Sequence, residues 1–294
     1  MKLKSLFLIV VFIFTSTKTF AQKEVSKFNR KRVLIVGSSL VTAVSASYYY
    51  IEKSWWSEKQ IPFHFDDGAD LTYALNVDKC GHFLGGLHAA DIFSSSMKWT
   101  GMKETHSLWS GAAFGFALQL AIEIKDAYAP YWGFSKWDLG LGTAGALWPV
   151  GQYYCNDLKA INFKFSYFKH SNIYWELDLQ RGKETSQFSW HDDYPNQTYW
   201  ATFDVNHFIE TCNWPKWLDI AIGFGLDDTQ YLNNNTKTGG NNEFYIALDY
   251  DLPKMLKKWD TKFSKKVKHW LNYIHFPAPT IMISPKVKFY PLFL

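Results

Sequence analysis

The stretch NDLKAINFKFSY, residues 156–167, is where the sequence changes character. Before it, apolar residues recur at helical spacing among many glycines; within it, Phe163 and Phe165 alternate with polar residues. Strict alternation is typical of a strand with two different faces. The sequence therefore predicts a small-residue-rich helical bundle over residues 22–155 and an antiparallel β-rich region over residues 156–294, an α+β fold.

The same alternation predicts further strands in the second half of the chain. The clearest lie at residues 199–205, 244–250 and 281–289. About six strands can be counted, fewer than the roughly eight that a transmembrane barrel needs. We therefore expect a sandwich or a partial barrel, with a full outer-membrane barrel as the alternative.

Four helices are expected before this region, at residues 33–51, 78–99, 105–128 and 135–154. Glycines at spacings that permit close helix contact recur in the last three of them. The segment 33–51 carries no charge and is long enough to span a bilayer. Its serines and threonines weaken that interpretation, and a buried helix or a helix lying at a membrane interface are the alternatives.

The first 21 residues have the pattern of a secretory signal peptide. Lys2 and Lys4 precede an unbroken apolar run, and Ala21 ends a motif of small residues that suits cleavage. Removing this segment also removes Lys18, so the formal charge of +4 falls to about +1 (4 − 3). We expect an exported protein, periplasmic or associated with the outer membrane, and no nucleic-acid partner.

A basic segment interrupts the predicted strands. Met255, Trp259, Phe263 and Val267 recur at steps of about one helical turn, and Asp260 is the only acid among the surrounding lysines. Such an amphipathic helix can lie on an anionic membrane surface. It can equally be a solvated charged face over a core stripe. A membrane surface or another envelope protein is the partner that we expect.

Two groups of polar residues in the helical part have a simple interpretation as helix caps. Asp78 stands where a helix is expected to begin, beside Lys79, and can accept from the free amides of the first turn. Ser135 and Asp138 have the S-x-x-D spacing of a capping box. These four residues form a predicted structural motif.

His82, Glu123 and Asp126 lack such a local explanation. Glu123 and Asp126 are three residues apart and share a helix face, so packing against the helix of His82 would form a histidine–carboxylate cluster. That cluster could hold a divalent metal or perform general acid–base catalysis. The alternative is a buried hydrogen-bonded network in which Lys79 or Lys125 neutralises an acid.

No established catalytic motif accompanies these residues. The sequence contains no G-x-S-x-G, no H-E-x-x-H and no P-loop. We therefore expect a structural or binding component at the periplasmic face of the outer membrane. The alternative is a hydrolase or transferase that acts on an envelope lipid or glycan through His82, Glu123 and Asp126, with or without a bound metal.

Three cysteines are present, and an odd number is not a disulfide framework. For Cys80 and Cys155 we expect buried positions, where the thiol acts as a small apolar side chain. Cys212 offers no further prediction.

The polar motif as a whole resembles that of a bacterial envelope family. The shared residues are Asp78, Lys79, His82, Phe83, Glu123, Asp126, Gly133, Ser135 and Asp138. Over about residues 75–152 the chain resembles the YfiM-like periplasmic lipoproteins, domain of unknown function 2279, with a looser likeness to VanZ-like membrane proteins. The resemblance implies an envelope location and a helical fold. Without a cysteine at the expected cleavage site, a lipid anchor is not expected.

Overall fold

A computed structural model describes residues 28–54, 56, 59–173, 192–209, 213–230 and 240–293. The predicted signal peptide and Cys212 lie outside these residues. Helices and an antiparallel sheet are both present, which confirms the predicted α+β class. The chain divides into two compact units. The helical unit contains the described residues up to Asp67 with Gly85–Val150, and the sheet unit contains Gly68–Leu84 with the described residues from Gly151 onward.

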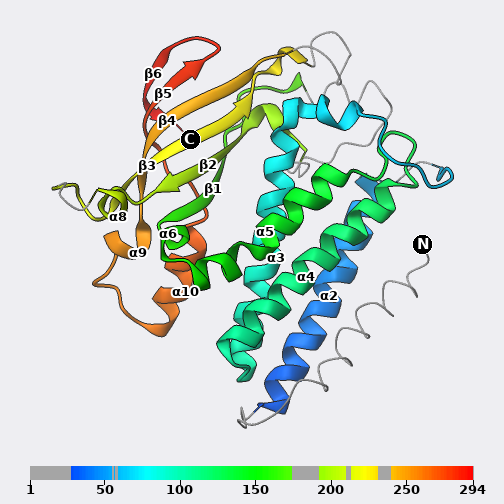
Figure 1. The fold of residues 1–294 in the computed structure, drawn as a ribbon, viewed down its shortest axis with the longest axis horizontal. Coiled ribbons are helices and arrows are strands. Elements are labelled where there is room, and N and C mark those ends of the chain that lie inside the picture. Colours follow the sequence, from blue (N-terminus) through cyan, green and yellow to red (C-terminus); the bar gives the residue numbers. More distant parts are fainter. Residues whose placement is uncertain are drawn as a thin grey trace. The chain divides into compact units, whose positions relative to one another are not determined.

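Long helices build the helical unit (Figure 1). They are α2 (Arg30–Ser54), α3 (Val77–Thr100) from Gly85 onward, α4 (Glu104–Asp126) and α5 (Lys136–Tyr154) up to Val150. All four predicted helices are therefore confirmed, within a few residues at each end. Gly133 precedes α5 with φ +140° and a backbone packed against Asp66, so the tight turn that separates α4 from α5 needs a glycine.

Glycines let the helices of this unit approach to backbone contact, as their spacing predicts. A Cβ atom placed on Gly86 of α3 would stand 2.0 Å from the carbonyl oxygen of Gly142 on α5. One placed on Gly111 of α4 would stand 2.3 Å from the carbonyl oxygen of Ala90 on α3. No side chain fits at these distances, so glycine is required at both crossings.

By length and composition, α2 and α4 could each cross a membrane. In the most apolar 18-residue stretch of α4, 39% of the residues are buried inside the protein. In the corresponding stretch of α2, no residue is buried. The buried alternative for the segment 33–51 is therefore wrong. Its large apolar side chains, such as Leu34 and Ile35, are exposed.

One six-stranded antiparallel sheet dominates the sheet unit (Figure 1). Its strands are β1 (Ile161–Tyr167), β2 (Gln197–Phe203), β3 (Leu218–Leu226), β4 (Asn242–Tyr250), β5 (Ala278–Ser284) and β6 (Lys288–Phe293). The spatial order follows the chain from β1 to β6, so every strand pairs with its neighbour in sequence. β-branched and aromatic residues, which favour a pleated surface, fill the strands.

The sheet is curled rather than flat. Lys164 on β1 and Asp249 on β4 form an ion pair at 2.6 Å, although three strand steps separate β1 from β4. Three steps along a flat sheet amount to about 14 Å, more than these two side chains can span. The edge of β1 is also covered in part, because Phe165 forms a parallel bridge with Ile274 from the segment that leads to β5.

Short helices connect the longer elements. They are η2 (Ala69–Leu71), η3 (Tyr73–Asn76), α6 (Asn156–Lys159), η4 (Tyr194–Asn196), α8 (Val205–Phe208), η5 (Asp228–Gln230), α9 (Leu252–Met255) and α10 (Lys262–Leu271). Cys80 is half-buried and Cys155 is exposed at the start of α6, and both are free thiols. The expected burial of Cys155 is therefore wrong, because the residue caps a surface helix.

Two elements differ from their predicted extent. The basic helix predicted from Met255 onward is broken into α9 and α10, because Thr261 and Ser264 form a capping box that starts a new helix. The strand predicted over residues 281–289 is likewise two strands, β5 and β6. Pro285 lies between them and cannot donate to a sheet ladder.

Candidate functional site

Glu123 and Ser135 meet at the junction of α4 and α5. Glu123 is 1% exposed, and its Oε2 atom accepts from the backbone N–H of Ser135 at 2.9 Å. The hydroxyl of Ser135 accepts from the backbone N–H of Asp138 at 3.1 Å, as a capping box requires. In the predicted box, the carboxylate of Asp138 would accept a hydrogen bond from the backbone N–H of Ser135. Glu123 from the preceding helix takes that role, and this buried carboxylate therefore stabilises the start of α5.

Asp126 and Lys125 have partners of a different kind. Asp126 accepts from the indole N–H of Trp56 at 2.6 Å. Lys125 is buried, and its ammonium donates to both carboxylate oxygens of Glu52 on α2 at 3.1 and 2.9 Å. The last turn of α4 is thus tied to the end of α2 and to the segment after it. Glu123 and Asp126 share a helix turn but serve separate contacts.

Lys79 is the centre of a buried charge cluster at the start of α3. Its ammonium lies 2.8 Å from Asp78 Oδ2 and 2.6 Å from Asp70 Oδ1. The helix begins at Val77, so Asp78 lies in the first turn instead of at the cap position predicted for it. A carboxylate is still favoured there by the helix dipole.

The chain enters α3 through a left-handed turn. Ala74, Leu75 and Asn76 have φ values of 46°, 49° and 65°. This conformation costs on the order of 1 kcal/mol for each residue that is not glycine. Amide groups fix the turn, since Asn76 Nδ2 donates to the Leu71 carbonyl and Asn242 Nδ2 donates to the Leu75 carbonyl. This turn sets the position of the Lys79 cluster.

His82 and Cys80 follow on α3 within the sheet unit, both half-buried. Burial, together with the charge of Asp78, raises the pKa of Cys80 to about 12. A thiol with so high a pKa stays protonated and is a poor nucleophile. Glu123 and Asp126 belong to the helical unit. The metal-binding or catalytic role expected for them with His82 stays a prediction.

The inner face of the sheet holds a second charge cluster, which the sequence analysis did not predict. Lys164 is 1% exposed and Asp249 and His275 are 0% exposed. Asp249 Oδ1 lies 2.8 Å from His275 Nδ1, while Asp249 Oδ2 pairs with Lys164. The His275 ring stacks on Trp200 with ring centres 3.9 Å apart. The three ionisable groups therefore form a fully desolvated triad in the concave side of the sheet.

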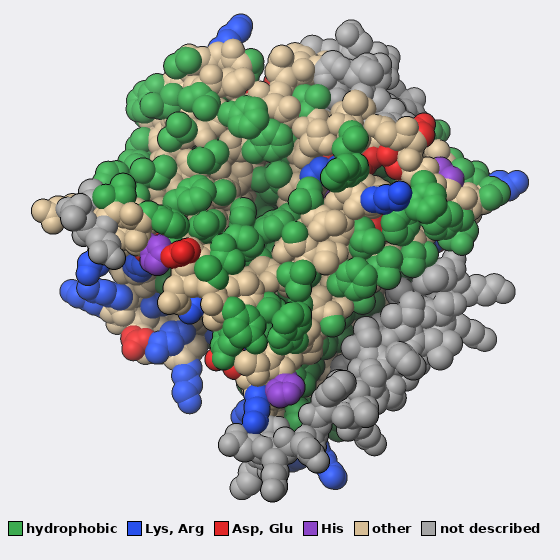
Figure 2. Space-filling model, viewed as in Figure 1, with side chains coloured by type: hydrophobic (Ala, Val, Ile, Leu, Met, Phe, Trp, Pro, Cys, Tyr) green, Lys and Arg blue, Asp and Glu red, His purple; other side chains and the backbone are tan. Residues whose placement is uncertain are grey.

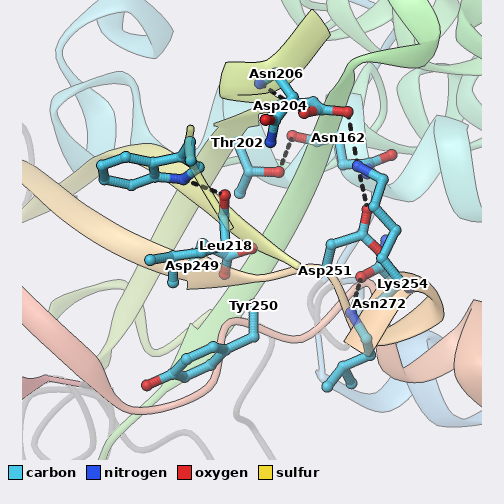
Figure 3. A network of polar contacts seen from close by, with 12 residues as sticks. Asn162, Thr202, Asp204, Asn206, Leu218, Asp249, Tyr250, Asp251, Lys254 and Asn272 are labelled. Atoms are coloured by element: carbon cyan, nitrogen blue, oxygen red, sulfur yellow. Dashed lines mark hydrogen bonds and ion pairs between the residues drawn. The ribbon is translucent and has the colours of Figure 1, made fainter. Parts of the chain in front are cut away.

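Lys254 forms a neighbouring cluster at the ends of β3 and β4 (Figure 3). Its ammonium lies 2.7 Å from Asp204 Oδ2 and 2.8 Å from Asp251 Oδ2. Burial alone would lower the pKa of Lys254, but the hydrogen bonds to these two carboxylates raise it above its usual value. The same ammonium holds the pKa of Asp204 below its usual range against the effect of burial. The ion pair between Lys254 and Asp204 is therefore charged at neutral pH.

Asp219 lies beside these groups and differs from them. It is 2% exposed and is the cross-strand partner of Asp249, and its Oδ1 atom has no hydrogen-bond partner among the described residues. Burial raises the pKa of the Asp219 carboxyl to about 7. Lys254 opposes this rise, and the surrounding carboxylates of Asp251, Asp249 and Asp204 add to it. Asp219 thus binds a proton near neutral pH.

Replacing Asp219 by asparagine is expected to change the pH dependence of stability. The unfolded pKa is about 3.9 and the folded one is higher, so the folded state binds more protons between these values and stability falls as pH rises through about 4 to 7. Asparagine cannot ionise and avoids this loss. Urea unfolding of both proteins should show that, between about pH 4 and about pH 8, Asp219→Asn gains about 4 kcal/mol relative to wild type, because a rise of about three pKa units is worth about 1.4 kcal/mol for each unit. If the free energy of unfolding changed with pH equally in both proteins, the raised pKa of Asp219 would be contradicted.

The sequence contained a signal for the inner clusters. Lys164, Asp219 and Asp249 occupy one phase of the alternation, between the aromatic and aliphatic residues of their strands. In most half-buried strands the polar phase faces water. Here the polar phase is buried. The alternation therefore groups the correct residues together but suggests that they face water, whereas they face the interior.

These features define an α+β protein with buried charge clusters. Residues 65–152 match the model of a family described as predicted periplasmic lipoprotein (DUF2279). The match confirms the family resemblance expected for about residues 75–152, and it supports an exported protein in the periplasm or associated with the outer membrane. No curated protein and no solved structure matches the chain.

Proposed function

We propose that the protein is a structural or binding component of the envelope that associates with the outer membrane, on its periplasmic side, through the outer face of its sheet. One observation carries this proposal. Ile222, Ile246, Ile281 and Phe289 are register partners in an unbroken row across β3, β4, β5 and β6, and they are 49%, 47%, 44% and 61% exposed. An apolar row is thus directed at solvent while charged side chains are enclosed.

The sheet exposes isoleucines on one face and buries charged side chains on the other, where they lie with an apolar cluster of Trp200, Ala221, Tyr245, Ala247 and Met282. A soluble antiparallel sheet buries its apolar face and leaves its polar face in water. A sheet in contact with lipid directs apolar residues outward and polar residues inward. The buried Lys164, Asp219 and Asp249 and the exposed isoleucines follow the second pattern. A hydrocarbon environment is therefore the one in which this arrangement is stable.

The apolar face extends beyond the central row. Further exposed members around β4, β5 and β6 are Phe244, Ile283, Val287 and Leu292. Figure 2 shows hydrophobic side chains spread over the area of the strands, with few charged ones among them. Contiguous apolar patches of this kind mark interaction surfaces, because they are costly to leave in water.

Two features of the helical unit agree with this role. The apolar window of α2 has no buried share, which suits a helix that also contacts lipid. Glu123 and Asp126, the carboxylates considered for catalysis, accept hydrogen bonds from Ser135 and Trp56. These contacts favour a structural role for the two carboxylates.

Flotation of the mature protein with phosphatidylcholine vesicles tests the proposal. The variant Ile246→Thr with Ile281→Thr keeps β-branched residues in the strands but removes apolar area. Each loss of about 1.4 kcal/mol lowers the binding constant tenfold, so we expect at least a tenfold loss of vesicle binding. The melting temperature should change little, because both side chains are nearly half exposed.

A matched control is available away from this face. Ile209, which follows α8, is 54% exposed, and Ile209→Thr should leave vesicle binding unchanged. Wild-type protein that fails to float with vesicles would overturn the proposal. A second outcome would also overturn it. If neither protein bound vesicles and only the wild type, not the Ile246→Thr/Ile281→Thr variant, captured an envelope protein, the face would be a protein interface.

A further inference from the structure

We propose that the segment from Leu252 to Leu271, which contains α9 and α10, binds the headgroups of anionic lipids. The inference rests on the proposed membrane association and adds the lipid class that the protein selects. The segment lies in the sheet unit, and Figure 2 shows positively charged side chains gathered where Figure 1 labels α9 and α10.

The segment is held in a fixed shape. The N–H of Lys254 donates to the side chain of Asp251, which caps α9, and Thr261 and Ser264 cap α10. Lys268 is 6% exposed, and its ammonium donates to the carbonyl of Leu256 in the connection between the two helices. Ser264 donates to the Trp259 carbonyl in the same connection. The surface of the segment is therefore preorganised for binding.

Large apolar side chains of this segment are exposed. Met255, Trp259 and Phe263 are 50%, 45% and 70% exposed, and Trp270 is 37% exposed. Phe263 and Trp270 are seven residues apart on α10 and so share a face of that helix. The alternative of a core stripe at these positions is wrong. The fully buried positions of α10 are Ser264 and Lys268.

Positive charge surrounds these aromatic residues. Residues 256–267 contain five exposed lysines and one acid, which gives a local charge of +4 (5 − 1). The lysines are Lys257, Lys258, Lys262, Lys265 and Lys266. The acid, Asp260, pairs with Lys265 at 2.9 Å. Because the whole mature chain carries only about +1, this segment is a local concentration of positive charge in a nearly neutral protein.

Exposed tryptophan and phenylalanine beside exposed lysines are the chemistry of a membrane interface. Amphipathic aromatic rings settle at the depth of the headgroups, and lysine ammonium groups attract the phosphates of anionic lipids. A site for a nucleic acid would also be basic, but the exposed apolar side chains of the same segment favour lipid. The two surfaces then act together, the sheet on hydrocarbon and the segment on headgroups.

The test compares vesicles of phosphatidylcholine alone with vesicles in which phosphatidylglycerol replaces part of it. The mature wild-type protein should bind the anionic vesicles at least tenfold more tightly, and added salt should remove the difference. The triple variant Lys257→Gln, Lys258→Gln, Lys266→Gln should lose this preference and keep the wild-type affinity for phosphatidylcholine. Unchanged melting temperature would show that the variant folds.

The control has the same change of charge in the helical unit. Lys59, Lys103 and Lys136 are exposed there, and replacing all three with glutamine should leave the preference intact. Equal loss in both triple variants would overturn the inference, since net charge alone would explain it. Equal affinity of the wild type for the two kinds of vesicle would overturn it as well. Failure of the membrane proposal looks different, because binding to phosphatidylcholine would then be absent.

Discussion

Lys164→Met is expected to destabilise the protein by about 3–5 kcal/mol, the cost of leaving a buried charge without its partner. Lys164 neutralises Asp249 at 2.6 Å and donates to the carbonyl of Tyr250 and to Asn272 Oδ1. Methionine fills much of the same volume but supplies none of these contacts. The carboxylate of Asp249, 0% exposed, would then share its site with the His275 ring alone.

Urea unfolding of the purified mature protein measures this loss. The control is Lys265→Met, which removes an ion pair whose side chains are 65% and 63% exposed. Exposed pairs contribute about 1 kcal/mol or less. The double variant Lys164→Met, Asp249→Asn removes both charges and should recover part of the stability. If Lys164→Met behaved like the control, the triad would not be a buried charge cluster.

Gly86→Ala is expected to cost about 3 kcal/mol or more, because the added methyl would force two helices apart. Its Cβ atom would lie 2.0 Å from the carbonyl oxygen of Gly142, an atom of the backbone that cannot rotate away. Shifting α3 from α5 would also disturb the contact of Gly115 with Ala146 and Gly86. A thermal melt of the variant would register the change as a lower melting temperature.

Gly140→Ala on α5 makes a sensitive comparison, since the same substitution should have the opposite sign. Apart from the backbone of its own helix, no atom of the described residues lies within 4 Å of the position that a Cβ on Gly140 would take. Alanine is favoured over glycine in a helix by about 0.5–1 kcal/mol, so this variant should be slightly more stable than wild type. A Gly86→Ala variant as stable as Gly140→Ala would mean that the helices do not cross at Gly86 as described.

The sequence predicted the elements well because their signals are local. Apolar runs with small residues gave the helices, and alternation gave the strands. It did not predict which face of the sheet is buried, because alternation shows two faces and only the curl that joins Lys164 to Asp249 encloses one of them. The break between α9 and α10 was local and could have been found in the T-x-x-S spacing from Thr261 to Ser264.

The candidate site was less predictable because its contacts are long-range. The spacing of Glu123 and Asp126 correctly gave two carboxylates in the last turns of one helix. The indole N–H of Trp56, which is distant in the sequence, donates a hydrogen bond to Asp126. The backbone N–H of Ser135, just before α5, donates to Glu123. No periodicity in the sequence indicates either contact.

The order of the sheet has a consequence for folding during export. Each strand from β2 to β4 pairs with the strand that precedes it, so these strands can pair in sequence order as the chain emerges. The bridge from Phe165 to Ile274 must wait for a segment that follows β4. Until that segment arrives, the edge of β1 is open to strands of other chains. Aggregation is therefore favoured at this edge until the bridge forms.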